Sequence, residues 1–221
     1  MSESRFQLHA YAKINLSLRV LGRREDGYHE IRTLFQTITL HDTLEFEPLD
    51  APQLEFTCDA HDIPTDESNL VLRAALALRE HFGVTHGARI RLDKRIPAQG
   101  GLGGGSSDAA VALVGLAHLW RLQTNGAELA SIGARLGADV PFFLRGGTAL
   151  GTGLGTEIAP LDDVAQRALV VVAPGVGVST AKAYKALNAP ALTKQDSAVI
   201  LHVSRAEAQI SSSLCEVLRN D

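Results

Sequence analysis

The sequence predicts an α+β fold, in which strands and helices occupy different stretches of the chain instead of alternating regularly. The first forty residues have mostly the period-two pattern that is typical of strands. The clearest helical patterns begin only after residue 68, and strand-like and glycine-rich segments separate them. With 221 residues, 45% of them apolar and 21% charged, the chain has the composition of an ordinary globular protein of one large domain or two small ones.

The N-terminal segment is predicted to form a hairpin of two strands. In the first strand, apolar residues occupy every second position, at Phe6, Leu8, Ala10 and Ala12 and then at Ile14, Leu16, Leu18 and Val20. The polar segment GRREDGY, residues 22–28, contains Asp26-Gly27, a pair that favours hairpin turns. In the second strand the alternation resumes at Ile31, Thr33, Phe35, Thr37, Thr39, Leu44 and Phe46.

Helices are predicted in the middle of the chain. Ser68 is the expected N-cap of a helix that Gly83 closes. Residues 88–97 are predicted to form a half-buried strand that leads directly into a glycine-rich loop. A strongly apolar helix over residues 106–122 carries the single tryptophan, and a short helix covers residues 127–136.

The C-terminal part mixes strand-like and helical signals. Residues 148–153 have a strand-like pattern between turns, and residues 167–174 are predicted to form a buried strand. Thr180 is the expected N-cap of a helix with the sequence AKAYKALN. A capping box over residues 204–207 predicts a last helix that runs nearly to Asp221.

Charge and cysteine content exclude several classes of protein. The net charge of −4 argues against a nucleic-acid partner, which normally requires a basic surface. No apolar stretch approaches the roughly 20 residues that span a bilayer, and the N-terminus lacks the apolar core of a signal peptide. Cys58 and Cys215 lie far apart and predict no disulfide framework. We therefore expect a cytoplasmic protein without a membrane or nucleic-acid partner, and the sequence leaves its oligomeric state open.

The segment PAQGGLGGGSSDAA, residues 97–110, predicts a site for an anion. Its five glycines allow successive backbone N–H groups to converge, and Ser106 and Ser107 open a helix whose positive end faces the same place. The segment is not a Walker A loop, because no Lys-Ser or Lys-Thr pair follows a glycine. A tight turn with glycines chosen for close packing is the alternative, but one or two glycines would suffice for it. The residues expected to form this anion site are Pro97, Ala98, Gln99, Gly100, Gly101, Leu102, Gly103, Gly104, Gly105, Ser106 and Ser107.

This glycine loop resembles the phosphate-binding loop of the galactokinase, homoserine kinase, mevalonate kinase and phosphomevalonate kinase superfamily. Within that superfamily, the segments AYAKINLSLRVLGRREDGYHEIRTLFQTI, GADVPFFLRGGTALGTGLGT and PGVGVSTAKAYKAL are similar to the 4-diphosphocytidyl-2-C-methyl-D-erythritol kinase family of non-mevalonate isoprenoid synthesis. The resemblance covers essentially the whole chain. It implies a two-domain small-molecule kinase fold, ATP as the phosphoryl donor, Mg²⁺ that arrives with ATP, and a cytidine diphosphate-linked methylerythritol as the substrate.

Two residues are expected to be catalytic on the basis of this resemblance. By themselves, a lone lysine such as Lys13 is usually solvated, and a lone aspartate such as Asp139 is usually a helix cap. The resembled family pairs these positions at the reacting hydroxyl group. Asn15 shares the strand face of Lys13, which would allow it to bind the same substrate.

The resemblance also implies a cytidine site. Tyr28 and His29 follow the hairpin turn, and in the resembled family these positions stack on the base and contact its edge. Tyr184 matches a second aromatic residue of that site, although a tyrosine in the core is equally compatible with its helix. Thr180 is expected to cap the helix and to contact the substrate as well. Without the resemblance, Tyr28 and His29 would be interpreted as a turn aromatic and a surface histidine.

The remaining polar and reactive residues carry no predicted chemistry. The other histidines form no metal-binding pair, so we predict no metal site built from protein ligands. Cys58 and Cys215 are interpreted as inert, and the basic residues Arg89, Arg91, Lys94 and Arg95 as the solvent face of a strand.

One departure from the family concerns the C-terminus. The family normally continues for some tens of residues past Asp221, with a third glycine-rich motif, so a first domain at 1–161 and an incomplete second domain at 162–221 are expected. Two alternatives stay open: a superfamily kinase with another acceptor, such as homoserine or mevalonate, and a nucleotide-binding fragment without catalytic activity.

Overall fold

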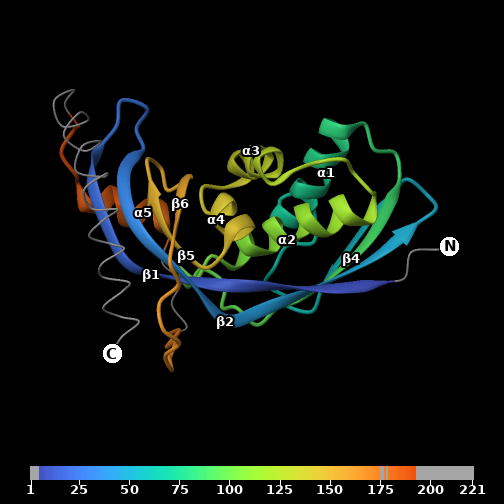
Figure 1. Ribbon diagram of the computed structural model, residues 1–221, viewed down its shortest axis with the longest axis horizontal. Coiled ribbons are helices and arrows are strands. Elements are labelled where there is room, and N and C mark those ends of the chain that lie inside the picture. The colour runs from blue at the N-terminus through green and yellow to red at the C-terminus, as the bar shows by residue number, and fades with distance from the viewer. Residues whose placement is uncertain (1–4, 175–176, 178, 193–221) are drawn as a thin grey trace. The chain divides into compact units, whose positions relative to one another are not determined.

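The computed structural model describes residues 5–174, 177 and 179–192 (Figure 1). Contacts group the chain into two units, the first comprising Met1–Lys13 and Ile38–Leu144, and the second Ile14–Thr37 and Arg145–Asp221. Both units therefore combine an N-terminal segment with a later one. This grouping rests on contacts alone, and the domain boundary expected at residue 161 stays a prediction.

Two long strands run through both units. Strand β1 covers Phe6–Arg23 and strand β2 covers His29–Leu49, and the two strands pair with each other. The turn between them closes where the Arg24 N–H donates to the carbonyl of Tyr28 at 2.7 Å, with Gly27 at a φ of 85°. A positive φ at this position is easy for glycine only, so the Asp26-Gly27 turn predicted from the sequence is confirmed.

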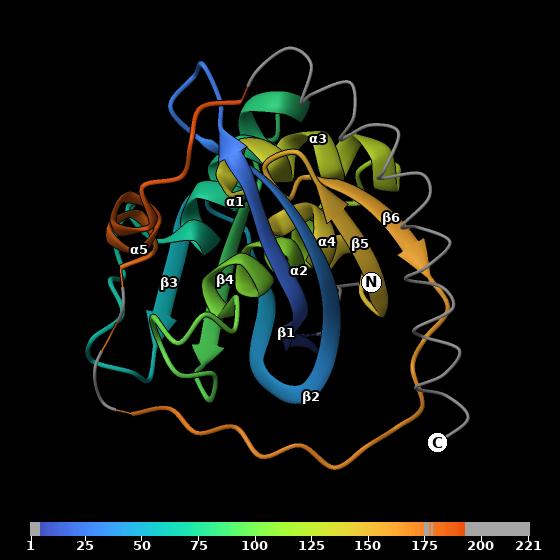
Figure 2. The same ribbon diagram turned by 90° about the vertical axis from the view of Figure 1, so that its left-hand side faces the viewer.

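The first unit packs helices against a sheet. Its further elements are β3 Leu54–Cys58, α1 Leu70–Phe82, β4 Gly87–Asp93, α2 Gly104–Leu119, α3 Gly126–Leu136 and α4 Val140–Arg145. Strand β4 pairs antiparallel with β2 and parallel with β3. Helices α1, α2 and α3 contact one another and lie together on one side of these strands (Figures 1 and 2).

The core of the first unit forms between α2 and the strands behind it. Phe46 of β2, Ile90 of β4 and Leu113 of α2 are completely buried. Gly115 of α2 allows the close approach, because a Cβ atom there would lie only 2.5 Å from the Phe46 ring. Burial of apolar groups on both sides of α2 therefore fixes this helix, and its N-terminal end with the glycine loop, against the sheet.

The second unit contains β5 Thr148–Thr152, β6 Glu157–Leu161 and α5 Thr180–Leu187. Strand β5 pairs antiparallel with residues 33–36 of β2 on one side and with β6 on the other. The α+β class, the N-terminal hairpin, the strand at 148–153 and the helix after residue 179 are therefore confirmed.

Several local predictions need correction. Asn69, not Ser68, caps α1 by accepting the Val71 N–H, and Ser179, not Thr180, caps α5 by accepting the Lys182 N–H. In both cases two residues able to cap a helix adjoin, and only the backbone path decides which side-chain oxygen reaches the first turn. The apolar helix begins at Gly104 and ends at Leu119 instead of covering 106–122.

The buried strand predicted at 167–174 is wrong. These residues form no regular structure, and the side chain of Val170 is 86% exposed. A strand needs a neighbouring strand as a hydrogen-bonding partner, and none of the described strands pairs with this segment. The helix predicted after residue 204 and Cys215 lie outside the described residues. In the described part of the chain, no helix is long and apolar enough to span a membrane.

Candidate active site

The glycine loop connects the end of β4 to the start of α2. Gln99, Gly101 and Gly103 have positive φ values of 55°, 72° and 74°. Gly103 is the N-cap of α2 and supplies no side-chain oxygen to the first-turn N–H groups of the helix. A Cβ atom at Gly103 would come within 2.5 Å of the Phe143 ring, so both φ and contact require glycine here. The first turn of α2 therefore presents backbone N–H groups without a covering side chain, as anion binding requires.

The two serines after the glycines have different surroundings. The Ser107 hydroxyl donates to the carbonyl oxygen of Tyr11 at 2.7 Å, and Ser107 is 1% exposed. Ser107 therefore ties α2 to β1. The Ser106 hydroxyl is half-buried and lies near Gly137, 3.6 Å from where a Cβ atom of that glycine would be. Ser106 thus faces the segment that carries Asp139.

Lys13 and Asp139 meet beside this loop. The Lys13 N–H donates to the carbonyl of Leu102 at 3.0 Å, and its Cγ lies 3.2 Å from the place of a Cβ atom at Gly103. Its Nζ is 3.7 Å from Oδ2 of Asp139. The Lys13 side chain is 7% exposed, whereas that of Asp139 is 33% exposed. An ammonium and a carboxylate from distant parts of the sequence therefore converge on the loop, with the carboxylate open to solvent.

The residues expected at the cytidine lie in the second unit. The rings of His29 and Tyr184 have centroids 5.1 Å apart and planes inclined by 31°. Tyr28 is 65% exposed, and its N–H donates to the Asp26 carboxylate. The Asn15 amide donates to the Thr33 hydroxyl. Thr180 is the first residue of α5, and its side chain lies outside the described part.

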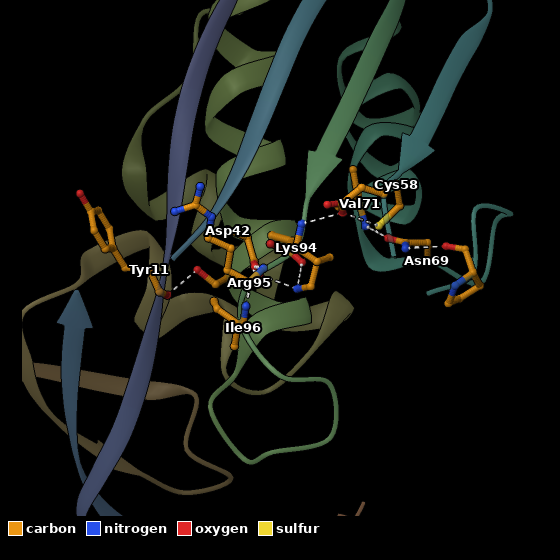
Figure 3. A network of polar contacts seen from close by, with 12 residues as sticks. Tyr11, Asp42, Cys58, Asn69, Val71, Lys94, Arg95 and Ile96 are labelled. Carbon is orange, nitrogen blue, oxygen red and sulfur yellow. Dashed lines mark hydrogen bonds and ion pairs between the residues drawn. The ribbon is translucent and has the colours of Figure 1, made fainter. Parts of the chain in front are cut away.

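A buried ion cluster beneath the loop was missed in the sequence. The Lys94 ammonium donates to Oδ2 of Asp42 at 2.5 Å (Figure 3). It also donates to Oδ2 of Asp108 at 2.8 Å. The Lys94 side chain is 8% exposed, so its interpretation as part of a solvent face is wrong. The alternation along the strands did contain a signal for this burial. Asp42 lies two positions before the buried Leu44, and Lys94 lies two positions after the buried Leu92, so each is expected on the buried side of its segment.

Burial and ion pairing compete in setting the pKa values of this cluster. Burial raises the pKa of Asp108 to about 7, although the Lys94 ammonium opposes the shift. Burial alone would lower the pKa of Lys94, but the carboxylates of Asp108 and Asp42 outweigh it and raise that pKa. Oδ1 of Asp108 is buried and has no hydrogen-bond partner among the described residues.

Burial also raises the pKa of the Cys58 thiol, which disfavours the reactive thiolate.

The comparisons with known proteins agree with the geometry of the loop. Residues 69–147 match the family model "GHMP kinases N terminal domain". A 4-diphosphocytidyl-2-C-methyl-D-erythritol kinase from Caldicellulosiruptor bescii is 43% identical over 96% of this chain and 75% of its own length. The chain belongs to this kinase family.

Solved structures support the same assignment. A crystal structure of a 4-(cytidine 5'-diphospho)-2C-methyl-D-erythritol kinase is 39% identical, with a TM-score of 0.69 over 86% of this chain and 69% of that one. A homoserine kinase from Cytophaga hutchinsonii is 19% identical with a TM-score of 0.61, so it shares the fold. The superfamily fold expected from the glycine loop is confirmed.

In the part of the chain that is described, no three His, Cys, Asp or Glu side chains are grouped to hold a metal ion. The candidate site residues combine the backbone N–H groups at the start of α2 with one ammonium and one accessible carboxylate. That combination can bind a phosphorylated ligand and position a hydroxyl group beside it.

Proposed function

We propose that the chain transfers the γ-phosphoryl group of ATP to the 2-hydroxyl of 4-diphosphocytidyl-2-C-methyl-D-erythritol. The observation that carries this proposal is the place of Lys13, whose Cγ lies beside Gly103 of the glycine loop and whose ammonium lies 3.7 Å from the Asp139 carboxylate. Family membership supports the same reaction, since the relatives are named as kinases of that compound.

The glycine loop is the proposed binding site for the phosphates of ATP. Residues 97–107 supply backbone N–H groups, and the positive end of the α2 dipole favours negative charge at the same place. Ser106 is better placed to contact a phosphate oxygen than Ser107, whose hydroxyl already donates to Tyr11. Mg²⁺ would arrive with the nucleotide phosphates and reduce their negative charge.

Lys13 and Asp139 are proposed to act on the reacting groups. The Asp139 carboxylate accepts the proton of the acceptor hydroxyl while that oxygen forms a bond to the γ-phosphorus and the bond to the leaving ADP oxygen breaks. The Lys13 ammonium, 3.7 Å from the carboxylate, offsets negative charge on the transferred group. Positioning of the two reactants can supply roughly 7–11 kcal/mol of the barrier.

The second unit is proposed to recognise the cytidyl part of the acceptor. The His29 and Tyr184 rings lie close enough to act together on one flat base, and the exposed Tyr28 adjoins His29 in sequence. Asn15 and Thr180 are proposed to hold polar groups of the same substrate. A non-nucleotide acceptor such as homoserine offers no base for these rings.

Release of ADP by the purified chain tests this function. The chain is incubated with Mg-ATP alone, with the cytidyl acceptor, with homoserine and with mevalonate. We expect release only with the cytidyl acceptor. Release with homoserine or mevalonate would assign a different acceptor. ATP binding by a folded chain without ADP release under any condition would identify a nucleotide-binding protein that lacks catalytic activity.

A further inference from the structure

Three charged side chains from three different elements meet in the interior beside the glycine loop. Figure 3 labels two of them, Asp42 and Lys94. Asp42 belongs to β2, Lys94 directly follows β4, and Asp108 lies in the second turn of α2. Their side chains are 0%, 8% and 4% exposed. Nothing in the phosphoryl transfer itself uses these groups, so their burial needs another explanation.

Carboxylates hold the chain where it enters the loop. Oδ1 of Asp42 accepts the N–H of Arg95 at 2.5 Å and that of Ile96 at 2.8 Å. Oδ1 of Asp59 accepts the N–H of Lys94 at 2.9 Å. Three successive backbone N–H groups are thus bound by side-chain oxygens immediately before Pro97. Because each bond fixes a peptide orientation, the path of the chain into the loop is determined.

The Lys94 ammonium connects this entry to the exit of the loop. It bridges Asp42 of β2 and Asp108 of α2. It also lies 3.2 Å from where a Cβ atom of Gly104 would be, at the first residue of α2. The Lys94 ammonium therefore forms ion pairs on both sides of residues 97–103: with Asp42, which binds the chain before the loop, and with Asp108, which follows the loop in α2.

Stability alone does not account for such a cluster. The free energy lost when buried ions are removed from water is about as large as the free energy gained from their attraction. Proteins in which apolar residues replace such a pair are often equally stable. A buried ion cluster instead favours one arrangement of the elements that carry it, because any other arrangement leaves a charge without its partner. The arrangement favoured here is that of the loop relative to the first turn of α2.

We propose that Asp42, Lys94 and Asp108 are positioning residues that hold the glycine loop in the geometry that binds the phosphates of ATP. This inference rests on the proposed ATP-dependent function. The three side chains act through the backbone of residues 94–104 and not on the reacting atoms. Loss of the bridge therefore affects ATP more than the acceptor.

The test compares Lys94→Gln with Arg91→Gln, a control in the adjoining strand β4 whose exposed side chain pairs with Asp93. For Lys94→Gln we expect the KM for ATP to rise about tenfold, and the KM for the cytidyl acceptor to stay within about twofold. Hydrogen exchange should accelerate in residues 94–107 and stay unchanged in α3. Arg91→Gln should match the unsubstituted chain.

Two results would overturn the proposal. One is a folded Lys94→Gln variant with the ATP KM and loop exchange of the control. The other is a parallel rise of both KM values with faster exchange throughout the first unit, which indicates general loosening. If Lys94→Gln does not fold, Asp108→Asn decides, because it keeps an acceptor oxygen and the side-chain volume. We expect its ATP KM to rise about threefold, and an unchanged value contradicts the proposal.

The same experiment separates this inference from the proposed function. If the unsubstituted chain releases no ADP with the acceptor, the function fails. Calorimetric titration with a non-hydrolysable ATP analogue then replaces the KM, since it requires no turnover. Weaker analogue binding by Lys94→Gln, with faster exchange confined to the loop, still supports the positioning role. Equal affinity and equal exchange refute it.

Discussion

The two contact units of the chain differ in how much apolar surface they bury. The hydrophobic core cluster of the described residues lies entirely in the first unit, between α1, α2, α3 and the strands. In the second unit a smaller set is buried, including Phe35 and Leu150, whereas Leu18, Val170 and Val172 are exposed. The proposed phosphate site is thus built on a packed helix and sheet, and the proposed cytidine residues lie at a hairpin end and on a short helix.

This difference teaches where stability and recognition are determined. A group that must hold a phosphoryl group within a fraction of an ångström needs a rigid support, which buried α2 and β1 give to Gly103 and Lys13. Stacking on a flat base tolerates more variation in position. We therefore expect substitutions in the first unit to change turnover or folding, and those at the His29–Tyr184 pair to change acceptor binding.

The largest effect is expected from Asp139→Asn. Loss of the proton acceptor should lower kcat by a factor of about 10²–10⁴. The free energy of unfolding should change little, because the side chain is partly exposed. Initial-rate measurements of ADP release check this, with Asp93→Asn on the surface as the control. Near-normal turnover in folded Asp139→Asn would remove the catalytic role of this residue.

Phe46→Ala tests the core of the first unit. Removal of this completely buried ring beside Gly115 should lower the free energy of unfolding by about 3–5 kcal/mol. Val170→Ala in the second unit should change it by less than about 0.5 kcal/mol. Urea unfolding followed by fluorescence of the single, buried Trp120 measures both. Equal effects would mean that the units contribute equally to stability.

The pH dependence of stability tests the buried cluster. The pKa of Asp108 is raised from 3.8 to about 7 in the folded chain, so the folded chain binds this proton more tightly than the unfolded chain does. The resulting stabilisation is complete below the unfolded pKa and is lost as the pH rises through the folded value, by an amount on the order of 4 kcal/mol.

Asp108→Asn isolates this effect, because asparagine does not ionise. Between pH 4 and about 7, the unfolding free energy of the unsubstituted chain should fall relative to that of the variant. Denaturant titrations at a series of pH values provide the measurement. A difference that is constant with pH would show that Asp108 keeps its usual ionisation.

The smallest effect is expected from Tyr184→Ala. Loss of one ring of the pair should weaken acceptor binding by about 1–3 kcal/mol, or roughly 5- to 150-fold in KM. The KM for ATP and the unfolding free energy should change little, because α5 lies outside the core cluster. A rise in the KM for ATP of the same size would place Tyr184 in a structural role.

Local patterns in the sequence predicted many of the elements and the chemistry of the loop. The alternation before Gly22, the Asp26-Gly27 turn and the apolar run of α2 are properties of neighbouring residues, so a single chain segment contains the information. The five glycines indicated an anion because close backbone approach is itself a local requirement. The roles expected for Lys13 and Asp139 came from resemblance, since a lone lysine or aspartate has no distinctive pattern.

Only the tertiary structure decided which charges are buried together and which apolar segments find a partner. Lys94 stands between the exposed Arg91 and Arg95, and its phase with Leu92 does not reveal its partners. It is buried because Asp42 and Asp108 arrive from distant segments. Residues 167–174 have a strand's composition but pair with no described strand. Propensity and periodicity act over a few residues, whereas ion pairing, sheet pairing and burial depend on residues that only folding brings near.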